Sequence, residues 1–173
     1  YTLSLHDALP ISLPRIVADR MVLPRLPDFL ARYPHVQVEL CVDPALTDLV
    51  AEGFDAGIRL GESLAQGMIA VPVGPPERQV VVATPAYFER HGVPQTPHDL
   101  QSHACIVHRL ANGRLMPWEF SREGHDLDVE VNGRLVFNDA GVAHRAVLAG
   151  LGMAQGFASL MADDIAAGRL QSV

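Results

Sequence analysis

The chain has 173 residues, of which 49% are hydrophobic and 19% charged, a composition typical of a folded globular protein that excludes a disordered one. The formal net charge of −7 lacks the basic surplus that nucleic-acid-binding domains carry. No apolar run approaches the ~18 residues of a membrane-spanning helix, and residues 1–10 have neither the basic start nor the apolar core of a secretion signal.

The two cysteines, Cys41 and Cys105, lie far apart in the sequence, and neither belongs to a closely spaced pair of the kind that binds metal. Both fall in apolar, strand-like runs, where a cysteine side chain packs as a small hydrophobic group. We therefore expect buried free thiols, which fits the reducing cytoplasm.

In the first half of the chain, short strand-like runs alternate with helical patterns. Strands are predicted where apolar residues alternate with polar ones or run together, at residues 11–16, 36–42, 54–60 and 68–73. One helix is predicted to start at Asp19 and to be irregular in its first half, which contains two prolines. Another occupies residues 46–52 and ends at Gly53, which suits a left-handed terminal position.

The second half begins with a buried strand at residues 79–83 and a helix capped by Thr84. A second capped turn starts at Thr96, and a strand follows at residues 104–110. Residues 112–137 contain two Asn-Gly pairs and a Glu-Gly pair between short strand-like runs, which predicts a β-meander.

The last part of the chain predicts a helix, a strand and a helix. Asn138 and Asp139 precede the first helix as caps, and Gly150 ends it. Residues 153–157 form the strand, and residues 159–167 form the last helix.

Several blocks of this sequence occur in an order that is known from one protein family. They are "LPRLPDFLARYPHVQVEL", "GFDAGIRLGE", "MIAVPVGPPERQVVVATPAYFERHGVPQTPHDL", "PWEF", "GRLVFND", "AVLAGLGMA" and "DDIAAGRL". Over roughly residues 13–173 the chain resembles the effector-binding domain of LysR-type bacterial transcriptional regulators. The resemblance implies an α/β fold with two lobes, like that of type 2 periplasmic binding proteins, with mixed sheets flanked by helices.

The resemblance also implies how the chain divides. Residues 11–80 correspond to the first lobe, residues 81–155 to the second, and residues 156–173 to an incomplete return to the first. Residues 1–10 depart from the family pattern, and we expect them to be foreign or disordered. The family carries a winged helix-turn-helix before this domain and a closing strand and helix after it. The sequence contains neither, so we expect a domain truncated at both ends.

Polar or glycine-rich joints repeatedly connect the end of a predicted strand to the start of a helix. Unpaired N–H groups at helix starts favour anions, so we expect these joints to line an effector cleft between the lobes. The candidate effector-binding residues are Arg15, Val17, Arg59, Gly61, Thr84, Asn138, Asp139, Gln155 and Gly156.

Some of these candidates have structural alternatives. Arg59 can bind a ligand carboxylate or can instead pair with a neighbouring acidic side chain, from Glu62, Asp55 or Glu39. Thr84 and Asn138 serve first as helix caps. Gly61 has a role in backbone geometry.

No catalytic or metal-binding constellation is evident. The eight histidines form no HExxH motif and no close cluster with cysteine, so we expect no metal, no cofactor and no enzymatic activity. Trp118 is expected to fill the core of the meander. The Asp163-Asp164 pair lies on a predicted surface helix, where both carboxylates are expected to be solvated.

The resemblance implies a cytoplasmic ligand-sensing domain of a LysR-type regulator that binds a small metabolite, such as an organic acid. It implies a homo-oligomer, a dimer or tetramer, paired through the helix at residues 21–32. It also implies contact with DNA only through the absent N-terminal domain, and no contact with a membrane. The alternative is a solute-binding protein of a transport system, which would share the fold.

Overall fold

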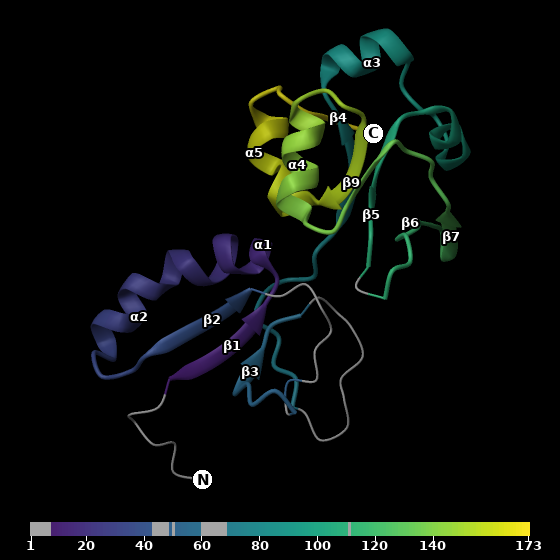
Figure 1. Ribbon diagram of the computed structural model, residues 1–173. Helices are drawn as coiled ribbons and strands as arrows, with labels where there is room; N and C mark the ends of the chain where they lie inside the picture. Colours follow the sequence, from purple (N-terminus) through teal and green to yellow (C-terminus); the bar gives the residue numbers. More distant parts are fainter. Residues whose placement is uncertain (1–7, 43–48, 50, 60–68, 111) are drawn as a thin grey trace. The chain divides into compact units, whose positions relative to one another are not determined.

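The computed structural model describes residues 8–42, 49, 51–59, 69–110 and 112–173, which belong to two compact units (Figure 1). Unit 1 comprises Tyr1–Pro72 and unit 2 comprises Val73–Val173.

Unit 1 contains a parallel sheet and an irregular helical segment. The strand order in the sheet is β2-β1-β3. The strands are β1 (Leu9–Leu13), β2 (Val38–Val42) and β3 (Ala56–Gly57). The helical segment between β1 and β2 consists of α1 (Arg15–Val17), the π-helical turn η1 (Ala18–Val22), the 3-10 turn η2 (Leu23–Arg25) and α2 (Leu26–Arg32).

The first helix begins four residues before the predicted cap, so the prediction for Asp19 is wrong. Pro14 is the capping residue, with an extended backbone that ends β1 and leaves Arg15 as the first helical residue. The predicted irregularity is confirmed, because the segment changes helix type three times, from α to π to 3-10 and back to α. The strand also starts earlier than predicted and includes Leu9 and Pro10, from the segment that the sequence analysis set aside.

The turn before β3 agrees with the prediction for its glycine. Gly53 has a φ of +75°, and the N–H of Phe54 donates to the carbonyl of Leu49 at 2.8 Å, as at the end of a helix. Most of the predicted helix at residues 46–52 lies outside the described residues, as does Leu60. The strand predicted at residues 54–60 is reduced to β3 within the part that is described.

The strand predicted at residues 68–73 is wrong for the described residues 69–73, which pair with no strand.

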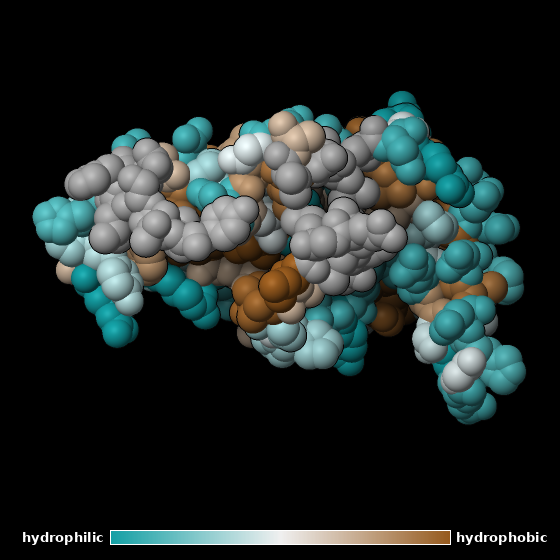
Figure 2. Space-filling view, turned by 90° about the horizontal axis from the view of Figure 1, so that it is seen from below, coloured by the Kyte–Doolittle hydropathy of each residue, from teal (hydrophilic) through white to brown (hydrophobic). Residues whose placement is uncertain are grey.

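Apolar side chains reach the surface in several places (brown in Figure 2). The most exposed large ones of the described residues alternate along this segment, with exposed fractions of 92% for Ile69, 71% for Val71 and 61% for Val73.

Unit 2 is built on a five-stranded mixed sheet in the order β10-β4-β9-β5-β8. Its strands are β4 (Gln79–Ala83), β5 (Cys105–His108), β8 (Leu135–Phe137), β9 (Met153–Phe157) and β10 (Gln171–Ser172). β5 is parallel to both β8 and β9, whereas β4 is antiparallel to both β9 and β10. The helices are α3 (Pro85–His91), the 3-10 turn η3 (Pro97–Ser102), α4 (Ala140–Leu148) and α5 (Ala158–Ala166).

Two predicted caps of unit 2, Thr84 and Thr96, are confirmed. Thr84 accepts a hydrogen bond from the N–H of Tyr87 at 3.2 Å, and Thr96 forms a capping box with Asp99. Figure 1 shows α4 and α5 together beside β4 and β9.

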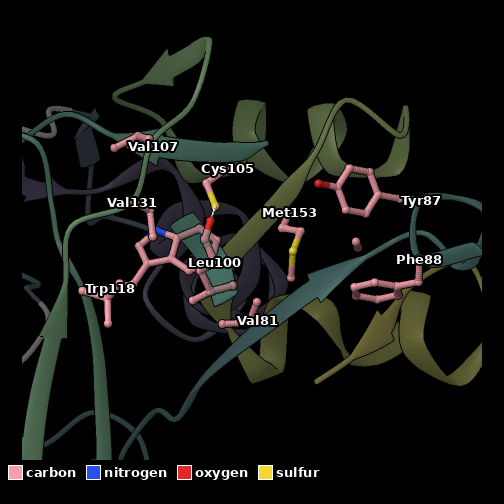
Figure 3. Packing of buried hydrophobic residues seen from close by; sticks show 11 residues of the cluster. Val81, Tyr87, Phe88, Leu100, Cys105, Val107, Trp118, Val131 and Met153 are labelled. Carbon is pink, nitrogen blue, oxygen red and sulfur yellow. Dashed lines mark hydrogen bonds between the residues drawn. The ribbon is translucent and has the colours of Figure 1, made fainter. Parts of the chain in front are cut away.

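The other face of the sheet carries the main hydrophobic core of the unit (Figure 3). Cys105, Val107 and Met153 point from the sheet into a cluster that includes Tyr87 and the buried indole of Trp118. The core role predicted for Trp118 is therefore confirmed. Both cysteines are free, but Cys41 is only partly buried.

The predicted meander is only partly correct. β6 (Trp118–Arg122) and β7 (His125–Val129) form an antiparallel hairpin around the predicted Glu123-Gly124 turn. β8, in contrast, leaves the hairpin and pairs in parallel with β5. The segment before β8, where the sequence predicted an Asn132-Gly133 turn, instead lies against β5. The N–H of Cys105 donates to the carbonyl of Asn132 at 3.1 Å.

The last residues also differ from the expected return to the first lobe. Residues 156–173 belong to unit 2, where α5 packs on β9 and β10 pairs with β4. The expectation that Asp164 is solvated is wrong as well. Its side chain is buried, and His144 and Arg169 both hydrogen-bond to its carboxylate.

Candidate functional site

Three strands of unit 2 end at the same edge of its sheet. β5 is parallel to β8 and β9, so the carboxyl ends of all three strands meet there. The register pairs His108 with Phe137, the last residue of β8. Ligands of α/β proteins commonly bind beyond the carboxyl ends of strands. We call this region, with His108, Asn138, Asp139 and residues 155–157, the strand-end edge of unit 2.

Asp139 occupies the start of the helix that begins at this edge. Its Oδ1 accepts a hydrogen bond from the N–H of Val142 at 2.8 Å, so the predicted capping role falls to Asp139, and Asn138 is exposed. A Cβ on Gly141 would lie 3.2 Å from Asp139 Oδ1 and 3.7 Å from Arg145 Nη1. A carboxylate and a guanidinium therefore both lie beside the first turn of α4. A helix start that already holds a carboxylate attracts a further anion less strongly.

Gln155 and Gly156 are neighbours on β9 and face opposite sides of the sheet. Gln155 Nε2 donates to the carbonyl of Glu119 on β6 at 3.1 Å, which ties β9 to the hairpin. Gly156 faces α5, where an added Cβ would lie 2.6 Å from Met161 Cε. Both residues belong to the strand-end edge, and each also has a structural role.

The sequence reasoning missed His108 as a candidate. The predicted strand ran to residue 110, which placed this histidine inside a strand, whereas β5 ends at it. Its side chain is half-buried. Desolvation lowers the pKa of His108, and the negative charge of Asp139 raises it in part, so that the pKa lies below its ordinary value of 6.5.

Thr84 lies at the opposite edge of the sheet. β4 is antiparallel to β9, and the register pairs Gln79 with Phe157 and Val82 with Ala154. The carboxyl end of β4 therefore lies beside the start of β9. Consistent with this, a Cβ on Gly150 would be 3.7 Å from Thr84 Oγ1. Gly150 follows the last turn of α4, whereas Asp139 precedes its first turn. The structure does not bring Thr84 together with Asp139.

Unit 1 has a strand-end edge of its own, because its three strands are all parallel. Arg59, two residues beyond β3, reaches across to β1. Its Nη1 donates to the carbonyl of Ser12 at 2.9 Å, and its Nη2 donates to Ser12 Oγ at 2.8 Å. Ser12 is fully buried. The guanidinium therefore links the ends of two strands. Of the acidic partners considered for Arg59, Glu62 lies outside the described residues.

The other unit 1 candidates have different surroundings. Arg15 is exposed on the first helical turn after β1. Val17 is buried and packs with Leu13 and Ala18, and its N–H donates to the carbonyl of Pro14 at 3.0 Å. Gly61 lies outside the described residues.

Two units with parallel strand ends, joined in one α/β chain, define a class of fold. The structure superposes on the regulatory domain of AphB from Vibrio vulnificus with a TM-score of 0.82 at 26% sequence identity. The superposition covers 96% of this chain and 82% of that domain. The fold is that of LysR effector domains, which is related to type 2 periplasmic binding proteins.

A family model described as the LysR substrate binding domain matches residues 4–173, so the chain belongs to this family, which is not a family of enzymes. It is 36% identical over 173 residues to the uncharacterized HTH-type transcriptional regulator YcaN of Escherichia coli, covering 100% of this chain and 56% of that protein. It is 46% identical over 135 residues to a putative transcriptional regulator of Pseudomonas aeruginosa, covering 78% of this chain and 44% of that protein. The chain thus spans about half the length of these curated relatives.

In the part of the chain that the structure describes, no three side chains of His, Cys, Asp or Glu are grouped so that they could hold a metal ion. None of the described helices is long and apolar enough to cross a membrane.

Proposed function

We propose that this chain senses a small metabolite and thereby controls a LysR-type transcriptional regulator. The observation that carries the proposal is the strand-end edge of unit 2, where parts of three strands and a helix start present polar groups together. Unit 1 contributes a second edge of the same kind, which holds Arg15 and Arg59. An effector cleft between two lobes stays a prediction of the family resemblance.

The other parts of this function are also proposals. Contact with DNA would be made by a domain of the regulator outside these 173 residues, and a dimer or tetramer would transmit the effector signal to it. A ligand changes such an assembly only if it binds one arrangement more tightly than another. The relatives are transcriptional regulators, which favours this role over a solute-binding protein of a transport system.

A thermal-shift screen against organic acids and amino acids tests the proposal. A ligand at about 100 times its dissociation constant adds about 2.7 kcal/mol to the free energy of unfolding, which raises the melting temperature measurably. Asn138→Ala, at the strand-end edge and outside the cap, is expected to reduce that rise without changing the stability of the free protein.

Thr84→Ala is the matched control. It is expected to lower the free energy of unfolding by about 1 kcal/mol through the lost cap, while the ligand-induced rise stays the same, because Thr84 lies at the other edge of the sheet. A screen in which no compound raises the melting temperature would contradict the proposed function.

A further inference from the structure

A buried tyrosine and a buried histidine are joined in unit 2, where α3, η3 and the start of β5 meet. The exposed fraction is 3% for Tyr87 and 9% for His103, and the ring of Tyr87 belongs to the core cluster (Figure 3). The hydroxyl of Tyr87 lies 3.3 Å from His103 Nδ1, and it accepts a hydrogen bond from the N–H of Ala104 at 3.0 Å. One side chain of α3 thus holds the backbone that leads from η3 into β5. We call Tyr87, His103 and Ala104 the Tyr87 network.

The hydrogen bonds of this network require a neutral imidazole. The hydroxyl of Tyr87 has one proton to donate, and Nδ1 of a neutral His103 accepts it. No other residue that the structure describes accepts from this hydroxyl. An imidazolium has no lone pair, so the phenol proton would lose its acceptor even if the imidazolium donated to the tyrosine oxygen. A buried donor without an acceptor destabilises the closed arrangement.

The charged groups around His103 do not compensate for its protonation. Desolvation lowers the pKa of His103 most, His91 on α3 lowers it further, and the negative charge of Asp99 on η3 raises it in part. The pKa therefore lies below its ordinary value of 6.5. Asp99 Oδ2 already accepts from the N–H groups of Gln95 and Thr96 at 2.9 and 2.8 Å, which keeps the carboxylate at the start of η3. Burial raises the pKa of Tyr87, so its hydroxyl stays neutral in weak acid.

We propose that the Tyr87 network is a pH-sensitive switch, in which protonation of His103 releases Tyr87 and opens the junction of α3, η3 and β5 in weak acid. The junction lies at the amino end of β5, whereas the strand-end edge of unit 2 lies at its carboxyl end. The switch is therefore separate from the proposed effector site and does not depend on the proposed function.

Amide hydrogen exchange of the full chain, followed by NMR between about pH 8 and pH 5, tests the switch at the N–H of Ala104. In the open junction His103 regains its ordinary pKa of 6.5, so the open state binds more protons and is favoured as the pH falls. The protection factor, corrected for the intrinsic exchange rate, is expected to be constant above this pKa. Below it, the factor is expected to fall by up to about tenfold per pH unit, until the lower pKa of the closed junction is reached. The amides of β9 serve as the reference and are expected to keep their protection.

Two variants and one titration make the test specific. His103→Gln keeps an acceptor but cannot be protonated, so the protection of Ala104 is expected to lose its pH dependence. His98→Gln, on the exposed histidine of η3, is the matched control and is expected to keep it. NMR titration of the His103 ring in the wild type is expected to give a midpoint below 6.5 and needs no variant to fold.

Four outcomes overturn the inference. They are equal protection of Ala104 at pH 8 and pH 5, a pH dependence that persists in His103→Gln, a pH dependence that is lost in His98→Gln, and a midpoint of the His103 ring at or above its ordinary value.

Discussion

Gly133 lies against the backbone of β5 so closely that no side chain fits. An ideal Cβ at this position would be 1.6 Å from the carbonyl oxygen of Cys105. The contact is with backbone, so the neighbour cannot move aside as a flexible side chain would. The residue that looked like a turn glycine in the sequence is therefore required for the pairing of β8 with β5.

Gly133→Ala is expected to lower the free energy of unfolding by about 3 kcal/mol, because the backbone must shift to remove the overlap. Gly113→Ala is the control. Gly113 has a φ of +85° but nothing within 4 Å of an added Cβ, so only about 1 kcal/mol of backbone strain is expected. Urea denaturation measures both values, and an equal loss in the two variants would contradict the close approach.

The thiol of Cys105 is expected to be almost inert in the folded protein. Burial raises its pKa to about 12, so only ~1 in 10,000 molecules carries the thiolate at pH 8. Reaction with a chromogenic disulfide reagent is expected to show one thiol, Cys41, before unfolding and two afterwards. The variant Cys41→Ser isolates Cys105. Rapid labelling of that variant under native conditions would show that the thiol is accessible.

At the scale of single residues, the sequence predicted which residues end or cap helices better than it predicted which side chains hydrogen-bond to each other. The helix-ending role of Gly53 and the capping role of Thr84 could be predicted, because both depend on backbone interactions within four or five residues. The burial of Asp164 was missed because it depends on His144, twenty residues away, and on Arg169. Likewise, Ser12 was not foreseen as a partner of Arg59, because the two meet only through the pairing of β1 with β3.

A buried ionic cluster connects three elements of unit 2. Asp164 on α5 bonds to His144 on α4 and to Arg169, which leads into β10. The side chain of Asp164 is 8% exposed and that of His144 14%, whereas that of Arg169 is 57% exposed. The cluster holds the two helices of one face together and fixes the start of the last strand.

Asp164→Asn is expected to lower the free energy of unfolding by about 1–3 kcal/mol, because hydrogen bonds to a buried charge are lost. Burial by itself raises the pKa of Asp164, but the hydrogen bonds and charges of Arg169 and His144 outweigh it and lower the pKa overall. The stabilisation is therefore complete above the unfolded-state pKa of about 4 and is lost as the pH falls through the lower folded-state value.

Denaturation at a series of pH values below about 4 measures this effect. In that range the free energy of unfolding of the wild type is expected to fall to that of Asp164→Asn. Asp163→Asn, on the exposed neighbour, is the matched control and is expected to change the stability little. A difference between wild type and Asp164→Asn that stays constant down to the lowest pH would contradict the role of the ionised carboxylate.

At the scale of elements, the positions of most strands and helices of unit 2 could be predicted, but their directions could not. Apolar alternation and capping residues are local, so they located α3, α4, α5 and the strands between them. Whether two strands run parallel depends on the path of the whole chain. For this reason the sequence grouped Thr84 with the other candidates, although β4 runs opposite to β5, β8 and β9.

The two units differ in the amount of buried apolar surface. Among the described residues, unit 1 buries a small set that includes Leu13, Val17 and Ala18, whereas the core cluster of unit 2 contains larger side chains from several strands and helices. In unit 1, α2 has no buried residue at all. Since burial of apolar surface dominates stability, unit 1 is expected to be the less stable one.

Hydrogen exchange at increasing urea concentrations tests this difference. The backbone amides of β1 and β2 are expected to lose protection at lower urea than those of β4, β5 and β9. Val147→Ala, in the buried face of α4, is expected to lower the urea concentration at which unit 2 loses protection, so that it approaches the value of unit 1. Loss of protection in both units at the same urea concentration would show that the chain unfolds as one cooperative body.

The last strand of unit 2 runs back along the first. Gln171 is paired with Ala83 and Ser172 with Val82, and the N–H of Val173 donates to the carbonyl of Val81 at 3.0 Å. Residues 79 and 173 are thus close enough in the sheet to be joined by a short loop. Such a module is expected to tolerate circular permutation, with new termini at the exposed Glu123-Gly124 turn. For the same reason, recombination is expected to be able to insert unit 2 into a surface loop of another protein without separating its strands.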